Sequence, residues 1–232
     1  AWVKRTVYGA DKFIFSAGSD ASNQHYLRFK SDNTLEATEK ISDSTQSSLI
    51  TNAVHRDTGW YHLVYVFDST QSTSSDRVSL YVNGVKQTAL STNTYPSQNH
   101  DSYINNTSAH YIGSSPLPSA YYDGSISQVY LIDGQALDAS YFGFTDPLTN
   151  TWKPKKYTGT FGTNGFWLPM DGSAPIGQDQ SGNGNDWTPV NFGGSVALDN
   201  PQVSGAKPIL NTTPGGTQAG VGVFGSRENV GY

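Results

Sequence analysis

The stretch GWYHLVYVFD, residues 59–68, decides the fold. In an extended chain, alternate side chains point to opposite faces of the sheet. One face then carries Trp60, His62, Val64 and Val66, and the other carries Tyr61, Leu63, Tyr65 and Phe67. Both faces are mostly apolar, which predicts a central strand that is covered on both sides. It is the longest strand candidate, and His62 within it is expected to be a hydrogen-bonded core histidine.

The sequence around this strand predicts an antiparallel sandwich with short strands. Residues 78–85 contain Asn83-Gly84, and both central positions of a type I′ turn need a positive φ, which this dipeptide supplies. Further short β-rich runs, bounded by Gly, Ser and Asp, are residues 1–5, 13–15, 25–29, 111–113, 124–132 and 165–170. Residues 136–142 are the one expected helical turn, with Asp133-Gly134 ahead of it.

The composition supports this fold class and excludes several functions. The 232 residues include 24 Gly and 11 Pro, no Cys, and 14 Lys plus Arg against 19 Asp plus Glu, for a net charge of −5. Abundant Gly with few helix formers is typical of an all-β chain with many turns. A mildly acidic chain lacks the basic footprint of a nucleic-acid partner. The absence of Cys excludes thiol chemistry, and the longest apolar run is too short for membrane insertion.

We expect residues 1–142 to form the sandwich and residues 143–232 to form a linker and an irregular extension rich in Gly and Pro. From about residue 193 the chain is poor in large apolar side chains, so the extension should pack on the sandwich or on a neighbouring subunit. The chain opens on Ala1 to Arg5 as if in the second half of a strand. That beginning predicts a longer polypeptide.

The order of the segments resembles that of a laminin-G-like domain. The resemblance is carried by residues 59–68, 80–85, 111–113, 123–129 and 135–137 in that order. It implies the concanavalin A-like jelly roll, in which two curved antiparallel sheets face each other. The segments that follow, residues 140–146, 152–166 and 179–188, resemble virion proteins of marine tailed bacteriophages, including those of cyanobacteria. This second resemblance implies a tail fibre, capsid fibre or decoration protein.

Aromatic and amide side chains in two loops are candidates for carbohydrate binding, which uses flat rings beside Asn and Asp. These residues are Tyr95, Tyr103, Asn105, Asn106, Tyr121, Tyr122 and Asp123. Tyrosine is also common at protein interfaces, so contacts with other virion proteins explain the same residues equally well.

A polar loop near residue 180 is a candidate calcium site, the one cofactor that the sequence suggests. Its potential oxygen ligands are Asp179, Ser181, Asn183, Asn185 and Asp186. Alternating oxygen ligands with Gly at the bend suit calcium. However, position 12 of such a loop would be Val190, so the usual Glu is missing. A turn held by Asn and Asp side chains is the alternative.

Other motifs do not predict catalysis. Retaining glycosidases place two carboxylates about 5–5.5 Å apart. Glu36 and Glu39 are three residues apart, so on a strand they point to opposite faces, and we expect a solvated charged edge. The tripeptide His55-Arg56-Asp57 lacks the other kinase motifs. The glycine pattern at residues 220–225 lacks the helix that a dinucleotide loop requires.

The sequence therefore predicts a non-enzymatic phage virion surface protein located on the extracellular particle. Its expected partners are other virion proteins, further copies of itself, and host cell-surface polysaccharide. A purely structural role in the virion is the alternative, and a glycoside hydrolase ranks third.

Overall fold

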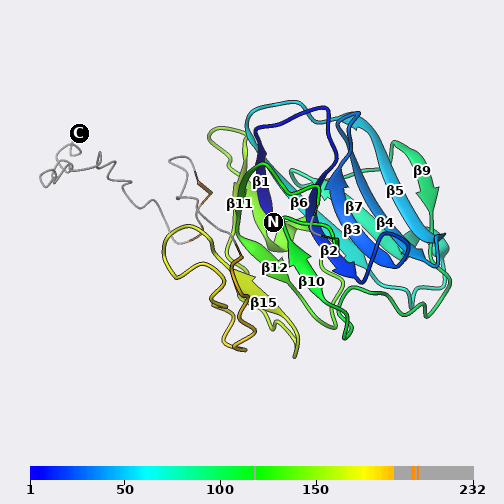
Figure 1. Ribbon diagram of the computed structural model, residues 1–232. Coiled ribbons are helices and arrows are strands. Elements are labelled where there is room, and N and C mark those ends of the chain that lie inside the picture. Colours follow the sequence, from blue (N-terminus) through cyan, green and yellow to red (C-terminus); the bar gives the residue numbers. More distant parts are fainter. Residues whose placement is uncertain (118, 191–199, 202, 204–232) are drawn as a thin grey trace, which may run out of the picture.

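The computed structural model describes residues 1–117, 119–190, 200, 201 and 203 (Figure 1). These residues form fifteen strands and two short 3₁₀ turns, and they contain no α-helix. All strand pairs are antiparallel, which confirms the expected fold class.

The strands in chain order are β1 (Trp2–Arg5), β2 (Lys12–Gly18), β3 (Gln24–Phe29), β4 (Thr34–Ile41), β5 (Ser44–Val54), β6 (Trp60–Phe67), β7 (Val78–Val82), β8 (Val85–Lys86), β9 (Leu90–Thr94), β10 (His110–Ile112), β11 (Gly124–Ser127), β12 (Val129–Leu131), β13 (Gly143–Thr145), β14 (Trp152–Pro154) and β15 (Phe166–Leu168). The 3₁₀ turns are η1 (Ser74–Asp76) and η2 (Ala139–Tyr141).

Two sheets face each other across one core. The five-stranded sheet has the order β11-β1-β6-β7-β8, and the six-stranded sheet has the order β10-β2-β3-β4-β5-β9. Side chains from both sheets meet between them, including Phe29 and Leu35 from one sheet and Leu63 and Leu80 from the other. Alternation along each strand sends these apolar residues inward, which is how a β-sandwich forms its core.

The central position predicted for residues 60–67 is confirmed, because β6 is the middle strand of its sheet. Its inner face carries Leu63 into the core. Its outer face carries His62, which is 2 % exposed and has the rings of Trp2 and Trp152 at 5.0 and 5.9 Å. Both faces are thus covered, but β6 is not the longest strand: β5 has 11 residues and β6 has 8.

Three local predictions have different outcomes. The hairpin at Asn83-Gly84 is confirmed, with φ of 49° and 83° at the two positions. The single strand expected at residues 124–132 is wrong: Gln128 has a φ of 51° and divides it into β11 and β12, which belong to different sheets. The expected helical turn is only η2, capped by Asp138, whose side chain accepts a hydrogen bond from the Ser140 amide.

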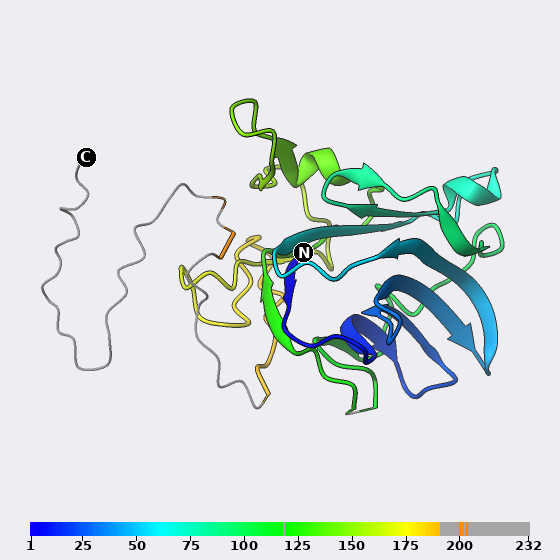
Figure 2. The same ribbon diagram turned by 90° about the horizontal axis from the view of Figure 1, so that it is seen from above.

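The described residues after 142 pack on the sandwich. Strand β15 pairs with β12, on the side of the molecule opposite β9 in Figure 1. The strands β13 and β14 form a hairpin, visible beside η2 at the margin of Figure 2. A second apolar cluster contains Val129, Phe166 and Leu168. The glycine pattern at residues 220–225 lies outside the described residues.

Candidate functional site

The predicted carbohydrate-binding residues do not form one site, because they lie near opposite ends of β3. The amide of Tyr103 donates a hydrogen bond to the carboxylate of Glu39, which pairs with His25 near the start of β3. Asp123 instead forms an ion pair with Lys12, which pairs with the last residue of β3. The two clusters therefore belong to separate surfaces of the sandwich.

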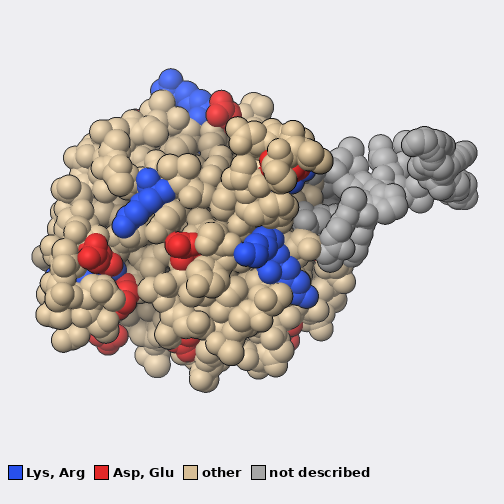
Figure 3. All heavy atoms as spheres, turned by 180° about the vertical axis from the view of Figure 1, so that it is seen from behind, with Lys and Arg blue, Asp and Glu red and all other residues tan. Residues whose placement is uncertain are grey.

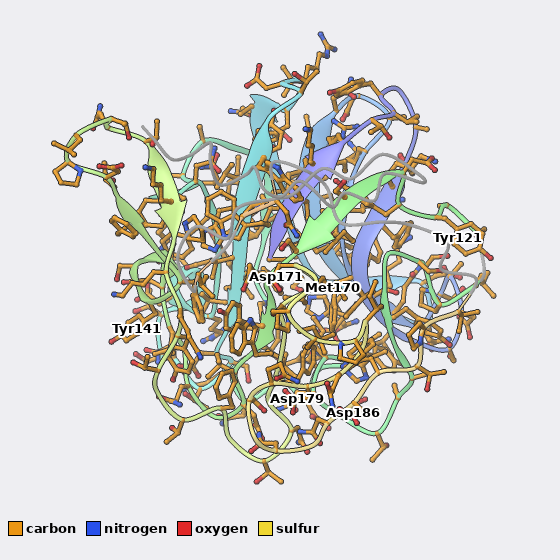
Figure 4. All side chains as sticks on the ribbon, turned by 90° about the vertical axis from the view of Figure 1, so that its left-hand side faces the viewer. Tyr121, Tyr141, Met170, Asp171, Asp179 and Asp186 are labelled. Carbon is orange, nitrogen blue, oxygen red and sulfur yellow. The ribbon has the colours of Figure 1, made fainter. Side chains whose placement is uncertain are left out.

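Only one tyrosine of the 121–123 cluster offers its ring to solvent. Tyr121 is 54 % exposed and lies at the margin of the molecule in Figure 4. Tyr122 packs against the core, and its hydroxyl is buried without a hydrogen-bond partner among the described residues. Burial raises the pKa of this hydroxyl. The prediction of a surface platform at Tyr122 is therefore wrong, since neighbouring residues of an extended chain point in opposite directions.

The other cluster forms a fixed loop at residues 100–106. Asn105 is exposed, and its side-chain amide donates a hydrogen bond of 2.8 Å to Asp133. Asn106 is also exposed and accepts a 2.7 Å hydrogen bond from the Ser108 amide. Tyr103 is half-buried, whereas Tyr95 packs on the core and is not part of this exposed surface.

The buried side chain of Glu39 in β4 holds this loop in place. Its carboxylate is 2.9 Å from the Tyr103 amide and 2.7 Å from Nε2 of His100, and the side chain is fully buried. Burial alone would raise the pKa of Glu39. Its partners instead lower this pKa to about 2: His25 contributes a hydrogen bond and charge, the Tyr103 amide a hydrogen bond, and His100 charge. A carboxylate with these partners acts as an anchor for the loop.

His25 extends the network across the core. Its Nδ1 lies 2.7 Å from the Ser102 hydroxyl, and its Nε2 lies 2.9 Å from the hydroxyl of Tyr65 on the opposite sheet. The network thus joins the loop to both sheets. The sequence does not predict this network, because Glu39 stands in a polar stretch that gives no sign of burial, and nothing in the β-rich run 25–29 indicates that His25 faces it.

A cavity of about 630 Å³ opens beside this network. Its wall includes Tyr65, Phe67, His100 and Ser102, together with Asn105. Asn105 is the only predicted carbohydrate-binding residue that lines it.

The carboxylates of Glu36 and Glu39 point to opposite faces of β4, as expected, but neither is solvated. Glu36 is 6 % exposed, and its carboxylate lies 2.6 Å from Nε of Arg28 and 3.0 Å from the Thr38 hydroxyl. The expected solvated edge is wrong because β4 is an interior strand of the six-stranded sheet. Both carboxylates are held in hydrogen bonds, and they do not share a face.

In the candidate calcium loop the side chains bind the protein itself. The carboxylate of Asp179 accepts hydrogen bonds from the Trp167, Ser181 and Asn185 amides and from the Ser181 hydroxyl. Asp186 accepts one from the Asp179 amide, and Figure 4 shows the two aspartates close together. The side-chain amides of Asn183 and Asn185 both donate to the Gly165 carbonyl.

These bonds fit the alternative of a turn held by Asn and Asp side chains. Within the described residues, no three His, Asp or Glu side chains come together to hold a metal. The donor set therefore does not fit a high-charge calcium site, and calcium binding stays a prediction.

The face that Figure 3 shows has no large patch of like charge. Its Lys, Arg, Asp and Glu side chains are scattered among uncharged ones. Among the described residues, no helix is long and apolar enough to cross a membrane.

Residues 1–140, more than half of the chain, match the laminin-G-type family model for the concanavalin A-like lectin/glucanases superfamily. The chain belongs to this superfamily. No curated protein and no solved structure gives a significant match. Membership is compatible with carbohydrate binding, and the superfamily contains both lectins and glycosidases.

Proposed function

We propose that this superfamily member is a non-enzymatic surface protein of a tailed-phage virion that binds host-surface glycan through the fixed loop at residues 100–106. The fixed loop carries this proposal. Glu39 holds the backbone amide of Tyr103, Asp133 holds the side-chain amide of Asn105, and the Ser108 amide holds the side chain of Asn106. The half-buried Tyr103 and the exposed Asn105 and Asn106 thus lie together on one fixed loop. A few polar groups beside a ring, held by a rigid scaffold, suit recognition of a polar ligand.

The non-enzymatic part of the proposal rests on the carboxylates. A retaining glycosidase needs two carboxylates about 5–5.5 Å apart that reach the same bond. Glu36 and Glu39 lie on opposite faces of β4. Each also has a structural partner, Arg28 for Glu36 and His100 for Glu39.

The virion part rests on the resemblance of residues 140–188 to marine phage virion proteins. A virion presents many copies, so weak single contacts add up because the second contact is effectively intramolecular.

The test is binding to an array of bacterial envelope polysaccharides, with Asn105→Ala as the loop variant. We expect at least about a tenfold loss of binding, which corresponds to the removal of one or two well-placed hydrogen bonds. The matched control is Tyr121→Ala at the other end of the sandwich, which should bind normally. Loss only in Tyr121→Ala would overturn the assignment to the loop, and no binding across the array would overturn the glycan proposal.

A purely structural role is the second candidate, and the β13–β14 hairpin favours it. Leu148 at its tip is 93 % exposed and Phe144 in β13 is 45 % exposed, and Tyr141 in the preceding turn η2 is 46 % exposed. Large apolar side chains exposed on neighbouring segments are typical of protein contacts. Light scattering should show smaller assemblies for Leu148→Ser than for the unmodified chain, whereas equal masses would exclude this contact.

A further inference from the structure

A buried arginine without a carboxylate partner ends strand β1. Arg5 is 2 % exposed. Its guanidinium donates hydrogen bonds of 2.5 and 3.3 Å to the carbonyl oxygens of His55 and Val7, and one of 3.1 Å to Oδ1 of Asn33. These acceptors are neutral, and no ion pair formed by the described residues includes Arg5. Arginine stays charged in proteins, and a buried charge without a counter-ion is unfavourable.

Aromatic rings surround this guanidinium. The rings of Tyr8 and Phe29 lie 4.7 and 4.3 Å from its central carbon. The ring of Phe29 in turn lies 6.0 Å from that of His55 and 6.1 Å from that of Tyr61. Aromatic faces attract a cation, but they carry no net charge. They therefore shield Arg5 from water and leave its charge without a full counter-charge.

Three buried polar atoms in this cluster have no hydrogen-bond partner among the described residues. They are Nε of Arg5, Nε2 of His55 and the hydroxyl oxygen of Tyr122. The described residues contain eight such side-chain atoms, so three of the eight gather around one buried charge. Buried polar groups are nearly always paired, and those that are not indicate a bound water or ion.

Both neutral members of this trio interact with the charge of Arg5. Burial lowers the pKa of His55, and the charge of Arg5 lowers it further. Burial raises the pKa of Tyr122, and the same charge opposes that rise. Asp57 acts on His55 in the opposite direction, but it is exposed and forms no ion pair with Arg5.

The three atoms are all able to donate. Arg5 carries a hydrogen on Nε, a neutral imidazole places one on Nε2 when Nδ1 is bare, and the phenol of Tyr122 carries one. Three donors beside a full positive charge suit a small monovalent anion. A water molecule would accept the same hydrogen bonds but leave the charge uncompensated. Phosphate or sulfate would bring several further oxygens that also need donors.

We propose that Arg5, His55 and Tyr122 bind one halide ion, such as chloride, which neutralises the buried guanidinium. The ion joins the end of β1 to the segment after β5 and to the segment before β11. This site goes beyond the proposed function. It lies beside Phe29, the last residue of β3, whereas the network that supports the 100–106 loop contains His25 near the start of β3.

The test is thermal unfolding of the whole chain while sodium chloride replaces sodium gluconate at constant ionic strength. Constant ionic strength removes the general screening effect of salt. A ligand that binds only the folded state stabilises it, so the melting temperature should rise with the chloride concentration. The ¹H–¹⁵N signal of Arg5 Nε should shift along a saturating curve, which gives the Kd for chloride.

Tyr122→Phe keeps the ring and removes one donor. We expect the Kd for chloride to rise at least about tenfold, which corresponds to the loss of one hydrogen bond to a charged group. Tyr130→Phe is the matched control. The hydroxyl of Tyr130 is also buried without a described partner, but it lies beside Trp167 rather than Arg5, so its removal should leave the Kd unchanged.

A melting temperature that does not depend on chloride would overturn the proposal and assign the three donors to bound water. Equal changes of Kd in the two variants would place the ion elsewhere and overturn it as well. Glycan binding by Tyr122→Phe should equal that of the unmodified chain. The two proposals can therefore fail independently.

Discussion

The indole Nε1 of Trp152 donates a hydrogen bond of 3.0 Å to Nδ1 of His62, 90 residues earlier in the chain. The bond joins β14 to the middle strand of the five-stranded sheet. It requires an unprotonated Nδ1, and burial lowers the pKa of His62 well below 6.5. The sequence predicts a hydrogen-bonded core histidine here, and this contact confirms it.

Replacing Trp152 by Phe should destabilise the fold by about 1–3 kcal/mol, because a smaller aromatic ring remains while buried Nδ1 of His62 loses its donor. Chemical denaturation at neutral pH measures this change. Trp60→Phe is the matched control: the indole N–H of Trp60 is buried without a described partner, so its removal leaves no group unpaired. Equal losses in the two variants would show that ring size, not the hydrogen bond, matters.

The Asn83-Gly84 turn depends on the same tryptophan. Gly84 has a φ of 83°, and a Cβ there would lie 2.6 Å from the Trp152 ring. Gly84→Ala therefore adds overpacking of about 1–3 kcal/mol to left-handed backbone strain of about 1–2 kcal/mol.

Gly9→Ala separates the two causes, since Gly9 has a φ of 76° but no atom within 4 Å of the position that a Cβ would take. Only the backbone strain should appear there. Thermal unfolding of both variants tests this expectation, and a loss at Gly9 as large as that at Gly84 would exclude the ring contact as a cause.

The parts of the fold that the sequence predicts are those with local signals. β6 has apolar residues on both faces, and the Asn-Gly dipeptide supplies the positive φ values of its turn. The polar strands β4 and β5 gave no such signal. Their burial comes from partners distant in sequence, such as His100 for Glu39. Likewise, nothing local marks Gln128 as the residue at which one strand becomes two.

The candidate site was predicted only in part for the same reason. Composition identifies loops rich in Tyr and Asn, but the direction of each ring depends on the register of the strands. Tyr121 faces solvent while Tyr122 packs on the core. The support of the 100–106 loop by Glu39 joins residues that are 64 positions apart.

A substitution at Asp179 distinguishes a hydrogen-bonded turn from a calcium site in this loop. Because the Asp179 carboxylate accepts four hydrogen bonds, Asp179→Ala should lower stability by about 1–3 kcal/mol in the presence of a chelator as well as in calcium. The melting temperature of the unmodified chain should be the same in both solutions. A rise with calcium that is lost in Asp186→Asn would instead place an ion in this loop.

Glu39 predicts a pH dependence in the acid range. Its folded pKa of about 2 lies below the ordinary value of 4.5, so its contribution to stability is complete above pH 4.5 and decreases as the pH falls toward 2. His25 and His100 face the carboxylate and hold its charge. Glu39→Gln should remove this part of the pH dependence.

Asp32 and Asp146, whose pKa values are also about 2, remain in both proteins. The difference in unfolding free energy between the unmodified protein and Glu39→Gln therefore isolates the contribution of Glu39. Denaturant titrations at pH 2.5, 3.5, 4.5 and 7 measure that difference. It should be largest at pH 7 and shrink below pH 4.5, and a difference that is constant over this range would refute the role of the charge at Glu39.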